Sequence, residues 1–506
     1  MTLEKDQKMY LDRFSRPQEM HHGISRRAVL EYAGKALAVI ALPRSAWALA
    51  QNAGPGPVIT KLSDYMSAAA TRTLPEEVIA SAKLHLLDTL AAMISGIDLP
   101  PAVAAIRFAQ TGSASPVATV VGTNITCGPI DAALANGMLA HSDETDDSHA
   151  PSQSHPGCAV IPAALAAGEQ FGIDGAHFLR AIALGYDVGT RVTMAFGGAK
   201  FQTDTHHDSH STAGVFCAAA AAACAANLNS QQMRWVLDYT AQQTAGIAAW
   251  KRDLEHVEKS FVFAGMPSKN GVTAALVVQS GWTGVDDILS GSDNFLMAFA
   301  PQADPALLID KLGQRYEVVR TNIKKWSVGS PIQAPLDAME TLLKKYSFRA
   351  EQVKKVVVRS ATQEAVIVDN RTMPDICLQH MIAVMLVDGT ASFRSAHDLK
   401  RMQDPAILRE RAKVDLISDE GLDRLLPKRV AIVEVTLNDG SHLTERVEAV
   451  RGTAENPMTQ DEIVAKSRDL IAPSFGSARS AALIDRILKI EDIKNIRELR
   501  PLLQKA

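Results

Sequence analysis

Residues 212–228 read TAGVFCAAAAAACAANL, and this alanine-rich run indicates how the chain folds. Alanine is the strongest helix former, and its small side chain lets helix backbones approach closely. The run is too short and too weakly hydrophobic to cross a membrane as a helix, which takes about 20 apolar residues. It therefore predicts a buried packing helix.

The sequence on both sides of this run has a helical pattern, from about residue 57 to residue 300. Apolar residues recur at i, i+3 and i+4 in residues 78–92 (VIASAKLHLLDTLAA) and in residues 130–140 (IDAALANGMLA). Residues 159–170 repeat the same spacing. These segments predict further helices that pack around the alanine-rich one.

The pattern changes after about residue 310. Residues 352–360 (QVKKVVVRS) and 429–437 (RVAIVEVTL) carry β-branched runs bounded by polar turns, which is typical of strands. Asn438-Asp439-Gly440 directly after the second run is a strong hairpin signal. A helical pattern returns from about residue 459 to residue 505.

These patterns predict an α+β fold that is mainly α, with a large all-helical domain and a smaller α+β lid domain inserted in it. We place the helical domain at residues 51–310, the lid domain at 311–455, and C-terminal helices that return to the helical domain at 456–506. A cleft between two such domains is a natural place for a ligand.

The composition excludes several classes of protein. The 506 residues carry a net charge of −4 with 47% hydrophobic residues, so most of the chain is not disordered. The absence of a global positive charge and the 5% aromatic content argue against binding to nucleic acid. None of the five cysteines forms a CxxC pair, so we expect no zinc ribbon, and we expect these cysteines to be buried as small apolar residues.

The N-terminus resembles an export signal. Residues 25–30 (SRRAVL) contain adjacent arginines, a short apolar run follows at residues 33–43, and the small-x-small sites Ala46-Trp47-Ala48 and Ala48-Leu49-Ala50 come next. This order is typical of a twin-arginine signal peptide. We therefore expect residues 1–50 to be a signal peptide, the twin-arginine export machinery to be a transient partner, and the mature chain to be periplasmic.

The chemistry concentrates in residues 141–156, HSDETDDSHAPSQSHP. The fifteen residues from His141 to His155 hold three histidines and four carboxylates. Histidines and carboxylates bind metals, and they also exchange protons with a bound substrate. A polar loop that caps the neighbouring helices is the simplest alternative.

A second polar cluster, residues 205–212 (THHDSHST), lies directly before the alanine-rich helix. Its serines and threonines are candidate N-caps, and the helix N-terminus would favour an anion such as a carboxylate. Lys259 and Lys324 are candidate cations for the same ligand, although a single lysine is more often a surface charge.

Seven segments in this order resemble the MmgE/PrpD family, which includes 2-methylcitrate dehydratase, cis-aconitate decarboxylase and iminodisuccinate epimerase. The resemblance spans nearly all of residues 57–500, and its most specific part is the HSDETDDSH…HPG segment. The segments are LLDTLAAMISG (86–96), ANGMLAHSDETDDSHAPSQSHPG (135–157), LGYDVGTRV (184–192), HSTAGVFCAAAAAA (210–223), KNGVTAALVVQSGWTG (269–284), VGSPIQAPLDA (328–338) and MIAVMLVDG (381–389).

The resemblance implies a helical domain with an α+β lid, a homodimer, and small di- or tricarboxylate substrates. It also implies an active site without a metal and without a cofactor. By position in the family motifs it assigns three catalytic residues, namely Glu144 before the Asp-Asp pair, His155 in His-Pro and His210 in His-Ser-Thr.

The resemblance further assigns five substrate-binding positions. Lys259 matches a substrate-binding lysine, although the segment from there to Lys269 is one residue longer than usual. Lys324 opens the lid domain, and Ser148 replaces a threonine. The remaining two are Gln333 and His380, and His380 falls where some members have a tyrosine.

Two departures from the family pattern bear on the reaction. Gln333 lies where the decarboxylases have a catalytic histidine, and Phe263 lies where a family histidine often sits. Glutamine bonds a carboxylate but transfers no proton at neutral pH. We therefore expect a dehydratase-type lyase that removes a proton next to a carboxylate, with an epimerase or isomerase as the alternative. A decarboxylase and a non-catalytic carboxylate-binding protein are further alternatives.

Overall fold

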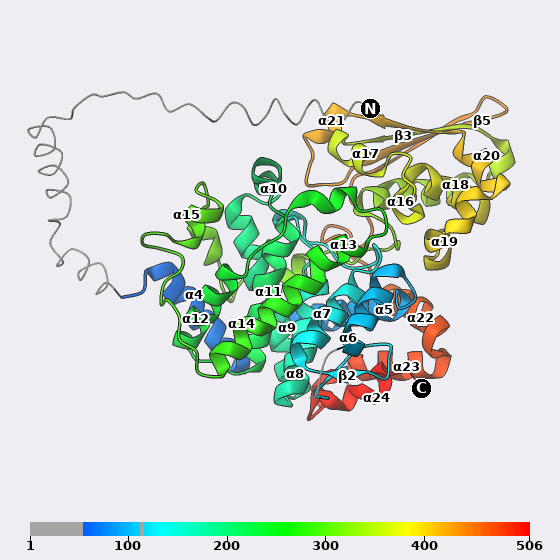
Figure 1. The fold of residues 1–506 in the computed structure, drawn as a ribbon. Helices are drawn as coiled ribbons and strands as arrows, with labels where there is room; N and C mark the ends of the chain where they lie inside the picture. The colour runs from blue at the N-terminus through cyan, green and yellow to red at the C-terminus, as the bar shows by residue number, and fades with distance from the viewer. Residues whose placement is uncertain (1–53, 112–115, 506) are drawn as a thin grey trace, which may run out of the picture. The chain divides into compact units, whose positions relative to one another are not determined.

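A computed structural model describes residues 54–111 and 116–505. The predicted signal peptide, residues 1–50, lies outside the described residues. Most of the described chain is helical, and a four-stranded mixed sheet and a two-stranded antiparallel sheet (β1, Ala118–Thr119, and β2, Thr126–Cys127) accompany the helices, which confirms the mainly α, α+β fold class (Figure 1).

The alanine-rich run forms α11 (Ser209–Ala225), and every residue of this helix is buried. It packs against α9 (Gly175–Phe196), α14 (Met266–Gln279) and α8 (Gly157–Phe171). The packing is close because small residues face one another, and a Cβ at Gly189 would lie 2.2 Å from the Ala213 carbonyl oxygen. The predicted packing helix is confirmed.

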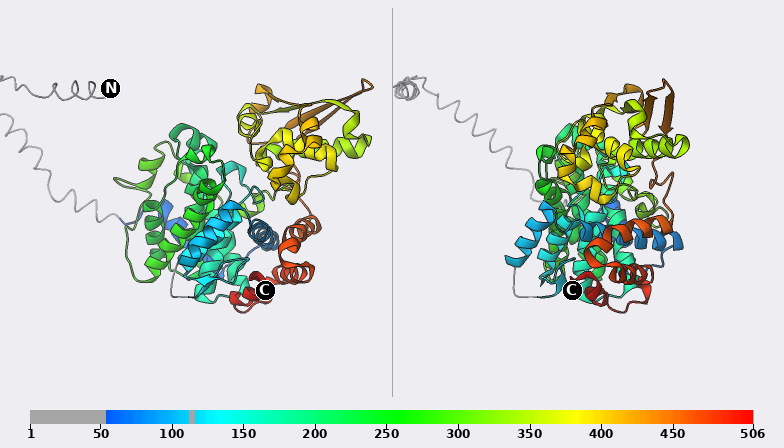
Figure 2. Two further views of the ribbon diagram at one scale, coloured as in Figure 1. Left: turned by 45° about the vertical axis from the view of Figure 1, so that its right-hand side comes forward. Right: turned by 90° about the vertical axis from the view of Figure 1, so that its right-hand side faces the viewer.

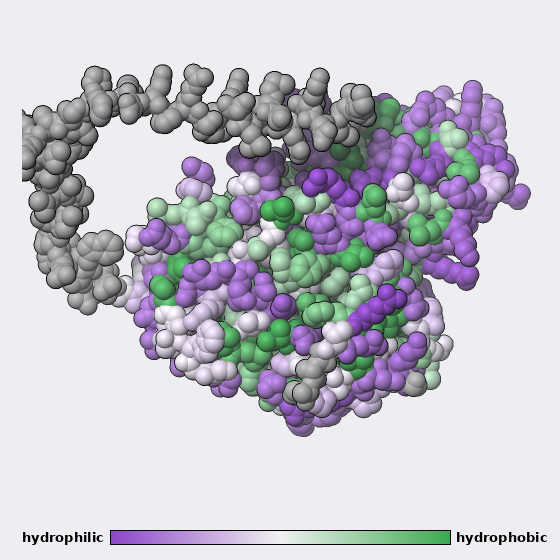
Figure 3. Space-filling view, viewed as in Figure 1, coloured by the Kyte–Doolittle hydropathy of each residue, from purple (hydrophilic) through white to green (hydrophobic). Residues whose placement is uncertain are grey.

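The other predicted helices of this region are α5 (Glu76–Ser95), α7 (Pro129–Ala140) and α8, and all three are confirmed. Two described segments, Glu76–Ser95 and Val257–Gln279, are long and apolar enough to cross a membrane. Most of each lies buried inside the protein, as is usual for a core helix. On the face shown in Figure 3, hydrophobic residues are scattered among polar ones, and polar residues dominate the α+β region at the upper right.

The sheet has the strand order β4-β3-β5-β6. β3 (Val353–Ser360) pairs in parallel with β4 (Val414–Ser418) and antiparallel with β5 (Ala431–Leu437), so that Val356 lies opposite Val435. β5 and β6 (His442–Val447) form the predicted hairpin. Gly440 in its turn has a φ of 90°, a conformation that favours glycine.

Two helices, α16 (Ser330–Tyr346) and α18 (Leu378–Asp388), form a second hydrophobic core with this sheet. The C-terminal helices α22 (Gln460–Phe475) and α23 (Ser477–Leu488) instead contact α5 and share the core of the helical region (Figure 2). The described chain from residue 55 to 505 thus contains two principal cores, one all-helical and one built on the sheet.

Candidate active site

The segment between α7 and α8, residues 141–156, is buried although it is strongly polar. Ionised side chains remain inside a protein only when they have partners. A solvated loop is therefore wrong as an account of this segment, although one of its carboxylates does bind the Gly157 N–H at the start of α8, at 2.9 Å. The buried acids, each at most 3% exposed, are Asp143, Glu144, Asp146 and Asp147.

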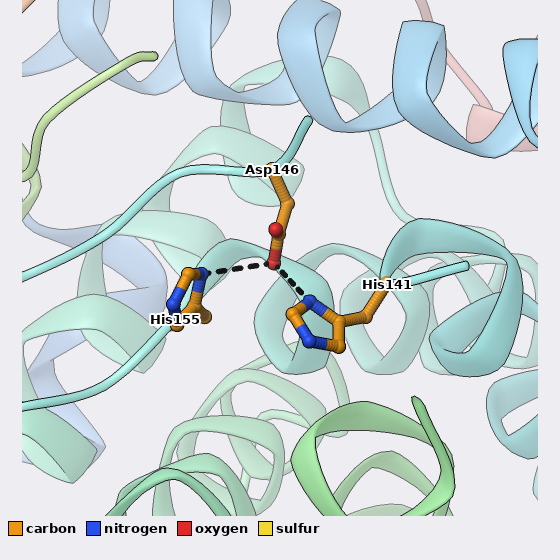
Figure 4. Close-up of side chains that lie close together, drawn as sticks. All are labelled: His141, Asp146 and His155. Atoms are coloured by element: carbon orange, nitrogen blue, oxygen red, sulfur yellow. Dashed lines mark hydrogen bonds and ion pairs between the residues drawn. The ribbon is translucent and has the colours of Figure 1, made fainter. Parts of the chain in front are cut away.

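Asp146 contacts two histidines through one carboxylate oxygen (Figure 4). Its Oδ2 lies 2.8 Å from Nδ1 of His141 and 3.3 Å from Nδ1 of His155, and Lys324 Nζ lies 3.6 Å from Oδ1. Burial would raise the pKa of Asp146, but these three groups hold it well below its usual range. Burial lowers the pKa of His155 to about 4 against the attraction of Asp146, so its imidazole is neutral at pH 7 and able to accept a proton.

Glu144 forms the second centre of charge. Its Oε1 forms an ion pair with Lys259 Nζ, while Lys324 Nζ lies 3.5 Å from Oε2 and donates to the Glu144 carbonyl at 2.8 Å. Burial would raise the pKa of Glu144, but the two lysines hold it well below its usual range. The structure therefore brings four of the predicted site residues together, although they come from three distant stretches of sequence.

His210 lies in the first turn of α11, next to this group. Asp208 is the N-cap of the helix, and its Oδ1 accepts a hydrogen bond from the Ser211 N–H at 2.7 Å. The other oxygen lies 3.2 Å from His210 Nδ1 and accepts from Trp250 Nε1 at 2.7 Å. Asp208, rather than a serine or threonine, therefore caps the helix and supplies the anion at its N-terminus.

Burial lowers the pKa of His210, and Asp208 opposes the shift. The imidazole of His210 is therefore neutral at pH 7, as is that of His155. The centroids of the two rings are 5.3 Å apart, so both can act on one small substrate.

Phe263 packs among the histidines. Its ring centroid lies 3.8 Å from that of His210 and 4.7 Å from that of His141, with interplanar angles of 12° and 20°. It belongs to a π-helical turn, Phe261–Gly265, in which each hydrogen bond spans one more residue than in an α-helix. This turn accommodates the extra residue that the resemblance indicates between Lys259 and Lys269.

Family models match most of the chain. Residues 60–308 match the MmgE/PrpD N-terminal domain and residues 326–490 match the MmgE/PrpD C-terminal domain. The chain belongs to the MmgE/PrpD family.

Several members of the MmgE/PrpD family are similar to this chain along nearly its whole length. It is 25% identical to a cis-aconitate decarboxylase of Aspergillus terreus over 484 residues, which cover 88% of this chain and 96% of the relative. It is also 25% identical to a cis-aconitate decarboxylase of Homo sapiens over 459 residues, 85% and 91% of the two chains. The cis-aconitate decarboxylase-like protein oryM of Aspergillus oryzae is 23% identical over 482 residues, 88% and 97% of the two chains. These relatives support an enzyme of the lyase type.

The other positions assigned by the MmgE/PrpD resemblance lie in different surroundings. Ser148 and Gln333 line, with Lys324, a cavity of about 290 Å³. The Ser148 backbone bonds that of Asn322 in both directions, at 3.0 and 2.8 Å. This cavity lies beside the charged cluster, and Lys324 is the residue common to both.

The side chain of Gln333 is fully engaged by the backbone of its own region. Its Nε2 donates to the carbonyls of Trp326 and Val328 at 2.7 and 3.0 Å, and its Oε1 accepts from the Trp326 N–H at 3.1 Å. His380 in α18 is fully buried, and neither ring nitrogen has a hydrogen-bond partner in the part of the chain that the structure describes. Within the described residues, no hydrogen bond or ion pair joins His380 to His155 or His210.

Sequence reasoning missed His256. This residue is buried, its ring centroid lies 5.2 Å from that of His141, and its Nε2 lies 4.0 Å from Glu144 Oε1. Its position three residues before Lys259, about one helical turn away, was the available signal.

Asp375 and His397, both from the α+β region, were also missed. Nε2 of His397 lies 3.9 Å from Asp375 and 3.9 Å from Asp143. Burial raises the pKa of Asp375 to about 6, and the nearby His397 opposes that shift. No sequence motif connects these residues, because the contact depends on how the α+β region packs against residues 141–156.

Two groups of side chains have the spacing of metal ligands, with ligand atoms within 4.8 Å of one another. They are His141 with Asp146 and His155, and His141 with Glu144 and His256. Lys324 and Lys259 contact the same two carboxylates, so each carboxylate already faces an ammonium group. A metal ion would have to compete with these cations for its carboxylate ligands.

Proposed function

We propose that this chain is a metal-independent lyase of the dehydratase type that acts on a small hydroxy di- or tricarboxylate. The observation that supports this most strongly is the pair of neutral histidines, His155 and His210, with ring centroids 5.3 Å apart. Each has its Nδ1 within 3.3 Å of a buried carboxylate oxygen, and two lysine ammonium groups lie in the same cluster.

In this mechanism Lys259 and Lys324 bind the substrate carboxylates by charge-assisted hydrogen bonds. One of the two histidines removes the proton from the carbon next to a carboxylate, and the lysines stabilise the negative charge that develops. The other histidine first takes up a proton from solvent and donates it to the hydroxyl group as the C–O bond breaks, so a double bond forms and water leaves. Glu144 orients Lys259 and Lys324 for these contacts.

Decarboxylation is a second candidate, and the names of the relatives favour it. On cis-aconitate, such a reaction would break one C–C bond to release CO₂ and form one new C–H bond on the remaining dicarboxylate. Gln333 argues against it, because it stands where the resemblance places a decarboxylase histidine and its amide is engaged by backbone groups. Epimerisation remains the alternative that requires proton exchange alone. The homodimer and the periplasmic location remain predictions.

The test is incubation of the mature chain with a chelator and a panel of di- and tricarboxylates in D₂O, followed by proton NMR. Elimination predicts loss of a Cα proton signal and a new vinyl signal. A product that has lost CO₂ would establish decarboxylation, and deuterium incorporation without a new compound, or with a diastereomer, would establish epimerisation. No change in any compound would overturn the proposed enzyme. Activity that disappears with chelator and returns with a divalent metal would overturn its metal independence.

A further inference from the structure

One carboxylate oxygen of Glu144 faces two possible partners. Lys259 Nζ forms an ion pair with Oε1, and Nε2 of His256 lies 4.0 Å from the same atom. His256 is 4% exposed, and its Nε2 is buried without a hydrogen-bond partner among the described residues. A buried ring nitrogen therefore faces an oxygen that a lysine already occupies.

The backbone of His256 holds the ring in this place under strain. The residue has a φ of 64°, which is uncommon for any residue other than glycine. Ser260 fixes the turn, because its N–H and its hydroxyl group both donate to the His256 carbonyl, at 3.1 and 2.8 Å. Strained residues of this kind cluster at active sites, where the surrounding structure maintains them.

Substrate binding creates a problem that a second partner would solve. If Lys259 binds a substrate carboxylate, Glu144 Oε1 loses its ion pair. Lys324 lies 3.5 Å from the other oxygen, and because it too binds a substrate carboxylate in the proposed mechanism, it does not replace Lys259. A buried carboxylate that loses its partner is strongly destabilised.

We propose that His256 takes the place of Lys259 on Glu144 when Lys259 binds a substrate carboxylate, and that it gains a proton from solvent in doing so. This inference rests on the proposed function and makes His256 a positioning residue. One N–H bond forms at Nε2 and donates to Glu144 Oε1, and no covalent bond to the substrate is made or broken.

The surroundings of His256 agree with this exchange. The charged and titratable groups that face it are Lys259, in the helix that begins directly after His256, and Glu144, His141 and Asp146 on residues 141–146. Burial, and then Lys259, hold the pKa of His256 well below its usual value in the free protein, so the ring is neutral at pH 7. Movement of Lys259 toward the substrate removes the second of these causes, and a bond to Glu144 favours the protonated ring.

The experiment compares the wild type with His256→Asn and His256→Gly, because asparagine and glycine tolerate a left-handed backbone while removing the imidazole. His177→Asn is the matched control, since that histidine is partly buried and bonds the Cys224 carbonyl away from the site. Calorimetric titration of tricarballylate and succinate at pH 7, in two buffers that differ in ionisation enthalpy, measures the protons taken up per ligand.

We expect both His256 variants to take up about one proton fewer than the wild type. Their Kd for tricarballylate should rise about tenfold to hundredfold, as for loss of one charge-assisted hydrogen bond. Wild-type affinity should strengthen as the pH falls, because binding takes up protons, and the variants should show a flatter dependence. On a substrate that is turned over, KM should rise more than kcat falls, and free imidazole should partly restore the affinity of His256→Gly.

Proton uptake and Kd equal to wild type in both variants would overturn the inference. A lower kcat with unchanged proton uptake would also overturn it, because His256 would then have another role. If the wild type turns over a carboxylate and only the variant results disagree, the proposed function stands without this step. If the wild type binds neither probe, the proposed function fails and takes this inference with it.

Discussion

The helical region and the α+β region differ in how far the side chains that they contribute to this site are already engaged by other groups of the protein. His155 and His210, from the helical region, each contact a buried carboxylate through Nδ1, which leaves the Nε2 atom outside that contact. Gln333, from the α+β region, has its amide engaged at both ends by backbone groups. His380, from the same region, is buried and has no hydrogen-bond partner among residues 54–111 and 116–505. In the proposed mechanism the proton-transfer groups therefore belong to the helical region, and a position in a family motif does not by itself make a side chain available to a substrate.

Among the substitutions that test this comparison, removal of the histidines of the helical region should have the largest effect on kcat. We expect His155→Ala and His210→Ala each to lower kcat by about 10²- to 10⁴-fold, the range for loss of a general acid or base. Steady-state kinetics on a substrate found in the carboxylate panel would measure this, with circular dichroism to verify the fold. Gln333→Ala is the matched variant from the other region, and its kcat should fall by less than about tenfold. Full activity in both histidine variants would show that the proton-transfer groups lie elsewhere.

The sequence predicted the local parts of this architecture because they depend on neighbouring residues. Alanine content and i, i+3, i+4 spacing predicted α11, α5 and α7, and β-branched runs predicted β3 and β5. The β4 strand was not predicted. It is short, it lies at the sheet edge, and only its first residue is buried, so it has no hydrophobic run to reveal it.

In the site, too, features that depend on neighbouring residues were predicted, and features that depend on distant contacts were not. Residues 141–156 stood out because their histidines and acids are close together in sequence. The contact between Lys324 and Asp146 joins positions far apart in the chain, and the orientation of His256 depends on a left-handed backbone. The local pattern offered Lys324 only as a candidate cation and the family resemblance gave it a place in the site, while nothing in the local pattern of residues 253–259 revealed the direction of the His256 ring.

Substitution of Lys324 tests whether the α+β region contributes to the site through its charge. Its side chain is 2% exposed and its Nζ lies within 3.6 Å of both Glu144 and Asp146. Replacing one partner of a buried ion pair leaves an uncompensated charge, so Lys324→Met should lower the free energy of unfolding by about 3 kcal/mol. Urea denaturation would measure this. The exposed Lys428, at the rim of the neighbouring cavity, is the control, and Lys428→Met should change stability by less than about 0.5 kcal/mol. Equal stability in the two variants would mean that Glu144 and Asp146 do not depend on Lys324.

Gln333→Ala should affect stability more clearly than catalysis. Removing the amide leaves the Trp326 N–H and the Val328 carbonyl without these bonds in a buried segment, while the Trp326 carbonyl keeps its bond from the Val328 N–H. Unsatisfied buried groups cost about 1–3 kcal/mol, so we expect a loss of that size in urea denaturation. Gln314→Ala, at an exposed position, should be nearly neutral. A variant with unchanged stability but a much larger KM would instead restore Gln333 to the substrate-binding role that the resemblance gave it.

Substitution of His380 should give the smallest effect. The sign of its effect on the pH dependence of stability distinguishes a buried core residue from a substrate-binding one. Burial, and then Arg411, lower its pKa to about 4 from an ordinary value of 6.5. Between these two values the unfolded chain binds more protons at this position than the folded chain does, so His380 makes the protein less stable as the pH falls from about 6.5 to about 4. His380→Met fills a similar volume without a titratable group. Its free energy of unfolding should therefore decline less steeply than that of the wild type over this pH range, and kcat at pH 7 should stay unchanged. If the free energies of unfolding of the two proteins instead decline in parallel with pH, and the KM of His380→Met is raised, His380 contacts the substrate.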